Sequence, residues 1–208
     1  MPTLELELAA RAATGLRHIV GIDEAGRGAI AGPVVAAAVI LPIDDAAQLA
    51  RLEGVADSKQ LTPQRREELY EQIIAAAVSY GIGATDAATI DKIGILPGNM
   101  RAMRAALAQL DPAAEYLLVD GPLLLRNVTL PQEAVVRGDS QCLSIAAASI
   151  LAKVTRDRYM IALDERHPEY GFSRHKGYCT REHVTAVTAQ GPCGEHRHSF
   201  APLRQPLL

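Results

Sequence analysis

The chain has 208 residues, of which 49% are hydrophobic, and it carries no tryptophan. This length suits one domain with a sizeable core of Ala, Val, Ile and Leu, and three scattered cysteines exclude a disulfide framework. The net charge of −3 opposes nucleic-acid binding only weakly, because residues 1–150 hold 12 Lys and Arg against 18 Asp and Glu, whereas residues 151–208 hold 9 against 6.

The first 16 residues are charged and rich in alanine, unlike a signal peptide, and no later apolar stretch is long enough to span a bilayer. We therefore expect a monomer in the reducing cytoplasm, without membrane contact. Residues 18–24 and 33–41 are apolar runs of strand length on either side of a glycine-rich turn. They predict a β-hairpin.

The middle of the chain alternates between helix and strand signals. Thr62 and Pro63 begin a helix that we expect to end near Val78, because a hydroxyl is preferred at the N-cap and proline at the first helical position. Further elements are expected, in chain order, as a strand at 80–85, a helix at 90–110 broken near Pro97-Gly98, strands at 115–120 and 134–136, a helix at 141–165 capped by Asp139-Ser140, and a helix capped by Thr180 that ends at Gly191-Pro192. This order predicts an α/β fold, with helices packed on one sheet.

The stretch GIDEAGRGAIAG at 21–32 is the most informative part of the sequence. Asp23 and Glu24 follow an apolar strand, as ligands of a hard cation would. Gly26-Arg27-Gly28 comes next, and glycines let a backbone approach a phosphate or a sugar closely. Because consecutive strand residues point to opposite faces, both carboxylates reach one site only if the strand bends, and we expect that bend near Gly26.

Two further carboxylates occupy similar positions. Asp120 ends a predicted buried strand, and Asp139 precedes a predicted helix. The carboxyl ends of neighbouring strands are where open α/β sheets place their sites. Four clustered carboxylates repel one another unless cations neutralise them, and two Mg²⁺ or Mn²⁺ ions ~3.5–4 Å apart can clamp the attacking and leaving oxygens of a phosphodiester. Taken alone, Asp120 is more typical of a turn and Asp139 of a helix cap than of a functional site.

Other patterns favour other sites less well. The spacing Gly26-x-Gly28-x-x-x-Gly32 differs from the dinucleotide-binding fingerprint, and a strand rather than a helix follows it. The histidine-rich end of the chain, with Cys179 and Cys193, is only loosely similar to a zinc finger. Four basic residues are candidate phosphate contacts, with solvated surface charge as the alternative: Lys59, Lys153, Lys176 and Arg197.

Together these segments resemble the bacterial ribonuclease HII family, the type 2 ribonucleases H. The motifs run through nearly the whole chain: the sequence from Gly21 to Leu41, DSKQL at 57–61, VDGP at 119–122, RGDS at 137–140, SIAAASILAKVTRDR at 144–158, HKGYCT at 175–180 and HRHSFAP at 196–202. The resemblance implies a ribonuclease H-like fold, with a mixed five-stranded sheet flanked by helices. It also implies a single domain over 1–208, with a core at about 17–165 and a C-terminal helical extension at about 166–208.

The resemblance further implies an endonuclease that hydrolyses the RNA strand of RNA–DNA hybrids and cuts 5′ of ribonucleotides embedded in duplex DNA, leaving a 3′-OH and a 5′-phosphate. Two Mg²⁺ or Mn²⁺ ions would be held by the family's four carboxylates, which are Asp23, Glu24, Asp120 and Asp139 here. The backbone of Gly26, Arg27 and Gly28 would read the ribose 2′-OH, and Tyr178 would stack on the deoxyribose that follows. The family also places basic residues at Lys59 and Lys153.

Three expectations complete the resemblance. Residues 93–99 depart from the family's helical segment, and we expect them to lie away from the metal site. Ala201–Leu208 is a candidate for the sliding-clamp-binding segment of some members, with a plain C-terminal tail as the alternative. The alternative function is an RNA–DNA hybrid-binding protein without catalysis, which would lack one of the four carboxylates, and none is missing.

Overall fold

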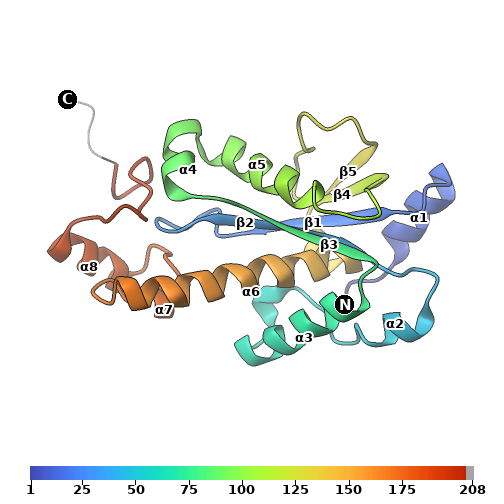
Figure 1. Ribbon diagram of the computed structural model, residues 1–208, viewed down its shortest axis with the longest axis horizontal. Coiled ribbons are helices and arrows are strands. Elements are labelled where there is room, and N and C mark those ends of the chain that lie inside the picture. The colour runs from blue at the N-terminus through green and yellow to red at the C-terminus, as the bar shows by residue number, and fades with distance from the viewer. Residues whose placement is uncertain (205–208) are drawn as a thin grey trace.

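The computed structural model describes residues 1–204, and the chain folds around one five-stranded sheet (Figure 1). The strands are β1 (Ile19–Ala25), β2 (Val34–Ile40), β3 (Ser79–Thr85), β4 (Tyr116–Asp120) and β5 (Gln132–Val135). The helices are α1 (Glu5–Thr14), α2 (Ala46–Ala50), α3 (Pro63–Ala76), α4 (Ala87–Ile93), α5 (Ile95–Leu107), α6 (Leu143–Arg166), α7 (Phe172–His175) and α8 (Arg181–Gln190), with short 3₁₀ turns η1 (Ser58–Gln60) and η2 (Gly138–Ser140). None of the helices within residues 1–204 combines the length and the apolar character needed to cross a bilayer.

The sheet has the strand order β3-β2-β1-β4-β5 and mixes both pairing directions. β1 pairs antiparallel with β2, as the predicted hairpin requires, and β2 pairs antiparallel with β3. β1 also pairs in parallel with β4, and β4 pairs in parallel with β5. The predicted α/β class and the mixed five-stranded sheet are therefore confirmed.

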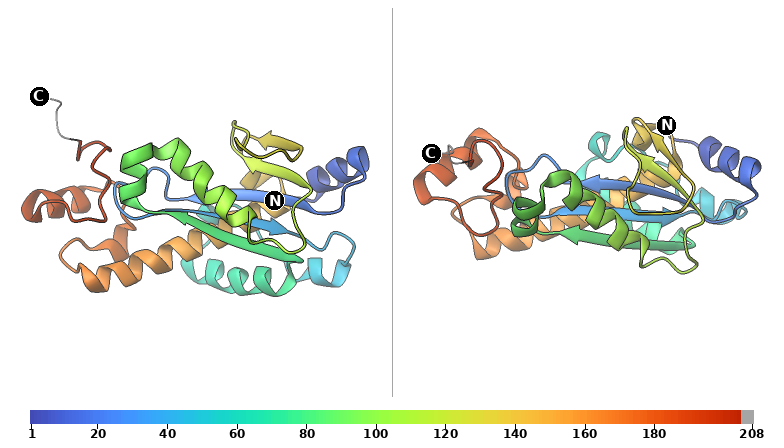
Figure 2. Two further views of the ribbon diagram at one scale, coloured as in Figure 1. Left: turned by 45° about the horizontal axis from the view of Figure 1, so that its top comes forward. Right: turned by 90° about the horizontal axis from the view of Figure 1, so that it is seen from above.

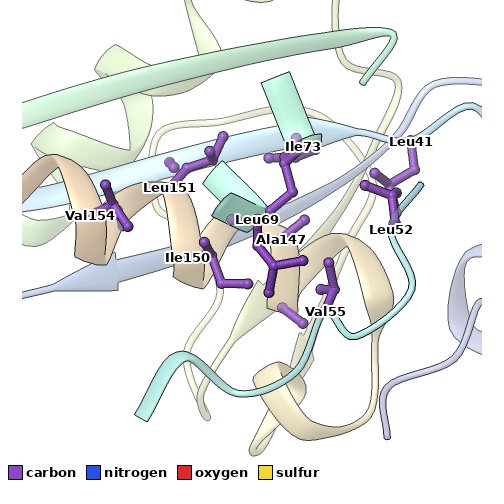
Figure 3. Packing of buried hydrophobic residues seen from close by; sticks show 14 of the residues in the cluster. Leu41, Leu52, Val55, Leu69, Ile73, Ala147, Ile150, Leu151 and Val154 are labelled. Atoms are coloured by element: carbon purple, nitrogen blue, oxygen red, sulfur yellow. The ribbon is translucent and has the colours of Figure 1, made fainter. Parts of the chain in front are cut away.

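Helices cover both faces of the sheet (Figure 1). One face carries α4 and α5, whose apolar side chains pack on alternate residues of β1 and β2 such as Val20 and Ala36. The other face carries α6 and α3. Figure 3 shows Leu69 and Ile73 of α3 beside Ala147 and other aliphatic residues of α6. The core is aliphatic throughout this layer, as the composition predicts.

Gly21 lets α6 lie directly on the centre of the sheet. A Cβ atom at Gly21 would lie 2.2 Å from the backbone carbonyl carbon of Ser144 and 2.3 Å from the backbone nitrogen of Ile145. No side chain fits there, so the first glycine of the 21–32 motif serves packing. This contact brings the first turns of α6 under the strand that carries Asp23 and Glu24.

Helix α6 begins later than the sequence indicates, and its cap is different. The predicted cap of Asp139-Ser140 is wrong, because both residues belong to the separate turn η2, and the N-cap Cys142 makes no side-chain cap. Glu7 of α1, which is fully buried, accepts a 2.7 Å hydrogen bond from the backbone N–H of Ser144 instead. A carboxylate from a distant helix thus satisfies the first turn of α6.

The break in the predicted helix at 90–110 also lies elsewhere. It falls at Gly94, which has a φ of +86° and separates α4 from α5. Pro97 sits in the first turn of α5, where its missing N–H costs no intrahelical hydrogen bond. The expected break at Pro97-Gly98 is therefore wrong.

The chain after α6 forms a lobe at one end of the sheet, with α7 and α8 and the C-terminal segment side by side (Figure 2). Thr180 caps α8 as predicted, because its hydroxyl accepts a hydrogen bond from the N–H of His183. The lobe packs on the last turns of α6 through Met160, Leu163 and Phe172. Half of the candidate clamp-binding segment, residues 205–208, lies outside the described part of the chain.

Candidate active site

Three of the predicted carboxylates lie at one edge of the sheet because β1 and β4 run in parallel. The register pairs Ile22 with Val119, so Asp23 and Asp120 follow on adjacent strands, with Glu24 next along β1. Asp139 lies on η2, which follows β5, and the backbone N–H of neighbouring Gly138 donates a 2.7 Å hydrogen bond to Oδ1 of Asp120. Segments far apart in the sequence thus deliver four acids to one place.

β1 keeps regular pairing with β2 through Ala25, so no bulge separates Asp23 from Glu24. The left-handed residue Gly26 (φ +88°) follows directly, and the bend expected near it stays a prediction. Asp23 lines a cavity with Ser149 of α6, and Glu24 lines that cavity as well as a second one beside Asn99 of α5.

Burial and neighbouring charges both disfavour the ionised forms of two of these acids. Burial, and then the charges of Glu24 and Asp120, raise the pKa of Asp23 well above its usual range. Burial, and then the charge of Asp139, raise the pKa of Asp120. Each effect comes from desolvation and from like charges, which both disfavour the ionised form. The site therefore holds negative charge that the protein does not fully neutralise.

Two cationic side chains contact the cluster. The ammonium of Lys59 donates a 3.1 Å hydrogen bond to Oδ2 of Asp139, and Arg27 donates one of 3.1 Å to Oε1 of Glu24. Partial burial lowers the pKa of Lys59, but the hydrogen bond and the charge of Asp139 outweigh that effect and raise it. Both cations are largely exposed, so they can leave the carboxylates without unfolding any core.

The donor set suits a hard divalent cation. Carboxylate oxygens are the ligands that Mg²⁺ and Mn²⁺ prefer. Within residues 1–204, no group of three His, Cys, Asp or Glu side chains is placed to hold a metal ion by itself. An open arrangement agrees with the chemistry of Mg²⁺, which keeps several water ligands and uses only one or two carboxylates.

A groove beside the carboxylates contains the residues that the resemblance assigns to the substrate, whereas the candidate phosphate contact Lys176 lines a different cavity. Its lining combines Asp23 and Glu24 with Gly26, Arg27, Gly28, Lys59, Lys153 and Tyr178. Gly28 has open space where a Cβ would lie, and Tyr178 is 37% exposed. The ammonium of Lys153 lies 5.8 Å from the centre of the Tyr178 ring and pairs with Asp157 at 2.8 Å. The structure thus brings these residues together in one groove, and their roles in substrate binding remain predictions.

Sequence reasoning missed several residues of the site. Ser58 and Ser149 are buried and share a 2.9 Å hydrogen bond in the floor of the groove, although both belong to motifs that the resemblance rests on. Leu96 and Asn99 line a second cavity with Glu24 and Asp120, so the expectation that residues 93–99 lie away from the site is wrong. Nothing local in the sequence marks them, because α5 reaches the site only through the packing of the sheet.

The basic and histidine-rich C-terminal residues also differ from expectation. Arg197 is neither a phosphate contact nor a solvated charge, because it is fully buried and donates to backbone carbonyls. His183 and His196 hydrogen-bond each other through their Nε2 atoms at 3.0 Å. The Nδ1 of His183 contacts the carbonyl of Tyr178, and that of His196 accepts the N–H of Cys193. These ring nitrogens serve internal hydrogen bonds, which disfavours the zinc alternative.

Comparison with known families agrees with the site. The family model described as ribonuclease HII matches residues 20–203. A ribonuclease HII of Geobacillus thermodenitrificans is 53% identical over 195 residues, which cover 94% of this chain and 73% of the relative. A ribonuclease HII of Roseiflexus castenholzii is 52% identical over 202 residues, which cover 97% and 89%.

Solved structures show the same fold. The ribonuclease H2 of Pyrococcus horikoshii superposes with a TM-score of 0.74 at 26% identity, over 89% of this chain and 95% of that one. The ribonuclease HII of Archaeoglobus fulgidus, solved in a complex with PCNA, gives a TM-score of 0.73 at 30% identity, over 91% and 98%.

Proposed function

Because this chain belongs to the ribonuclease HII family, endoribonucleases that act on RNA–DNA hybrids, we propose that its four clustered carboxylates are the catalytic centre and that the adjoining groove reads RNA–DNA junctions. The observation that carries the proposal is the meeting of acids from three separate segments, close enough to raise the pKa values of Asp23 and Asp120. Repulsion among these carboxylates lowers the stability of the fold, and such clusters are typical of sites where a bound ligand neutralises the charge.

The cluster would hold divalent ions, Mg²⁺ or Mn²⁺, through Asp23, Glu24, Asp120 and Asp139. When bound, such ions supply the Lewis acidity that activates water and stabilises the departing 3′-oxygen of a phosphodiester. Backbone N–H groups orient this centre: that of Glu24 donates to Oδ1 of Asp23, and that of Gly138 donates to Oδ1 of Asp120. None of the chain's own side chains needs to act as a nucleophile in this scheme.

The groove supplies the contacts that select the substrate. The backbone at Gly28 is open, so a ribose can approach it closely enough for its 2′-OH to be read, and only this hydroxyl distinguishes RNA from DNA at one position. Tyr178 presents its exposed ring for stacking on the next sugar. Lys59 and Lys153 would hold phosphates on the same path. Single ribonucleotides embedded in duplex DNA would therefore be substrates, as would RNA–DNA hybrids.

Cleavage of a labelled DNA duplex that carries one ribonucleotide tests this proposal. We expect a cut 5′ of the ribonucleotide with a 3′-OH and a 5′-phosphate in Mg²⁺, and none in EDTA. Asp139→Asn should fold but lose nearly all cleavage, whereas Asp86→Asn, which changes the distant cap of α4, should not. A wild-type cleavage rate for Asp139→Asn would show that Asp139 is not part of the catalytic centre. Binding of the duplex without cleavage would favour the non-catalytic alternative.

A sliding clamp is a further candidate partner. The support is that the relative from Archaeoglobus fulgidus was solved with PCNA and that this chain also ends in a short apolar segment, Ala201–Leu208. Removal of residues 201–208 should abolish co-elution with the clamp and leave cleavage of short duplexes unchanged. Unchanged co-elution would refute this role.

A further inference from the structure

Two buried arginines lie beneath the loop that joins β1 to β2. Arg156 comes from α6 and Arg197 from the segment after α8, and each has a relative exposure of 0%. Their guanidinium groups donate to backbone carbonyl oxygens rather than to carboxylates. Burial lowers the pKa of both, that of Arg197 to about 9, which leaves Arg197 protonated at neutral pH. Buried cations of this kind need a structural reason, because desolvation is costly.

Arg156 contacts both halves of the predicted sugar-reading surface. Its Nε and Nη2 donate to the carbonyls of Pro33 and Ala31 in the loop, at 2.9 and 3.1 Å. Its Nη1 donates at 2.9 Å to the carbonyl of Lys176, two residues before Tyr178. The guanidinium carbon also lies 5.3 Å from the centre of the Tyr178 ring, within the range of a cation–π contact.

The loop is shaped around this guanidinium. A Cβ at Gly26 would lie 1.8 Å from Nε of Arg156, so only glycine fits above it. The loop also pairs with the Tyr178 segment directly, because the N–H groups of Ile30 and Ala31 both point to the carbonyl of Gly177, at 2.9 and 3.2 Å. One side chain therefore lies at the point where the two segments meet.

Arg197 contacts only one of the two segments. Its Nε and Nη2 donate to the carbonyl of Gly32 and its Nη1 to that of Arg27, so all three hydrogen bonds end in the loop. The two arginines thus provide an internal comparison. Arg197 holds the loop alone, and Arg156 joins the loop to the Tyr178 segment.

We propose that Arg156 is a positioning residue that sets the spacing between the Gly26–Gly28 backbone and the Tyr178 ring, so that two consecutive sugars are read as one unit. This inference rests on the proposed function, in which those two elements read a ribose and the deoxyribose after it. Selectivity for the junction then depends on a side chain that never touches the substrate. Lysine cannot replace it, because an ammonium lacks the planar fork that reaches three carbonyls and the flat face that lies against a ring.

The test compares Arg156→Lys with Arg158→Lys, a matched control on the same helix whose exposed guanidinium pairs with Glu67 and Glu71. Two substrates are used: a DNA duplex with one ribonucleotide and a uniform RNA–DNA hybrid. For Arg156→Lys we expect cleavage of the single ribonucleotide to fall about 10²-fold, as small displacements of binding groups can cause, with a clearly smaller loss on the hybrid. Arg197→Lys should slow the cleavage of both substrates to a similar degree, and the Arg158→Lys control should change neither cleavage rate.

A double-variant cycle separates positioning from general damage. If Arg156 acts through Tyr178, adding Tyr178→Ala to Arg156→Lys should cause little further loss on the single-ribonucleotide duplex. Multiplied losses would overturn the inference while leaving the proposed function intact. A wild-type protein that cleaves neither substrate would instead overturn the proposed function.

Hydrogen exchange gives a readout that does not depend on activity. In Arg156→Lys the amides of Ile30 and Ala31 should exchange faster, because their pairing with Gly177 loses its support, and in the Arg158→Lys control they should not change. Unchanged exchange of both amides in Arg156→Lys would refute the inference. If lysine prevents folding, Arg156→Gln, which keeps two donors without a charge, takes its place in every measurement.

Discussion

Asp23→Asn should stabilise the metal-free protein and abolish cleavage. Asp23 is 5% exposed and lies beside Glu24 and Asp120, so its charge is both desolvated and repelled. Asparagine removes that charge and keeps an oxygen that can accept the 2.7 Å hydrogen bond from the N–H of Glu24. The shape and the local bonding of the site are therefore largely preserved.

The sign of the effect follows from proton linkage. Folding raises the pKa of Asp23 above its ordinary value of 3.8, so the folded state binds this proton more tightly, and stability falls as pH rises from that value through the folded pKa. Each unit of difference costs about 1.4 kcal/mol at neutral pH. Relief of this cost should raise the free energy of unfolding by about 1–2 kcal/mol, the range typical of one stabilising substitution.

Urea unfolding at pH 7 in EDTA and in Mg²⁺ measures both parts of the prediction. Wild type should gain stability from Mg²⁺, by about 2.7 kcal/mol at one hundred times the dissociation constant, and Asp23→Asn should gain much less. Asp86→Asn serves as the control, because the pKa of Asp86 is lowered by its capping hydrogen bond to Thr89 and its loss brings no relief. An Asp23→Asn protein that is less stable than wild type in EDTA would refute the electrostatic reasoning.

Three further outcomes are expected. Tyr178→Ala should slow cleavage of single embedded ribonucleotides more than cleavage of uniform hybrids, and equal losses in a parallel rate assay would exclude stacking at the junction. Gly21→Ala should lower the free energy of unfolding in urea by about 3 kcal/mol, because its Cβ would overlap the backbone of α6, whereas Gly194→Ala has open space and should cost far less. Burial lowers the pKa of His196 from 6.5 to about 4, so protonation favours the unfolded chain, and the free energy of unfolding should fall as pH drops through that interval. His196→Gln should reduce this dependence of stability on pH. A pH dependence equal to that of wild type would contradict the role given to His196.

Local signals in the sequence were enough to predict the elements nearest the site. The hairpin around the glycine-rich turn, the Thr62 cap of α3 and the Thr180 cap of α8 depend on neighbouring residues only, and all three are confirmed. Strand ends and helix ends differ by a few residues, as for β5, which spans Gln132–Val135 rather than 134–136. These errors arise because pairing partners, rather than propensity, decide where a strand stops.

Features that depend on distant contacts could not be predicted. The role of Glu7 requires Ser144, which lies 137 residues away, and nothing near Glu7 indicates that it caps another helix. Asn99 reaches the site only because α5 packs on the sheet beside Glu24. A single sequence does not show which distant residues come together in the fold. Residues such as Glu7 and Asn99 therefore cannot be distinguished from ordinary surface or core residues.

The buried charges of this fold fall into two kinds, and the distinction follows from what satisfies them. Arg156 and Arg197 are satisfied within the chain by six hydrogen bonds to carbonyls, so removal of either guanidinium leaves buried acceptors unpaired and should destabilise the protein. Asp23 and Asp120 each accept a backbone hydrogen bond, but burial and the charges of neighbouring acids disfavour their ionised forms. Neutral substitution should therefore cost stability at the arginines and increase it at these carboxylates, which identifies the carboxylates as the charges kept for a ligand.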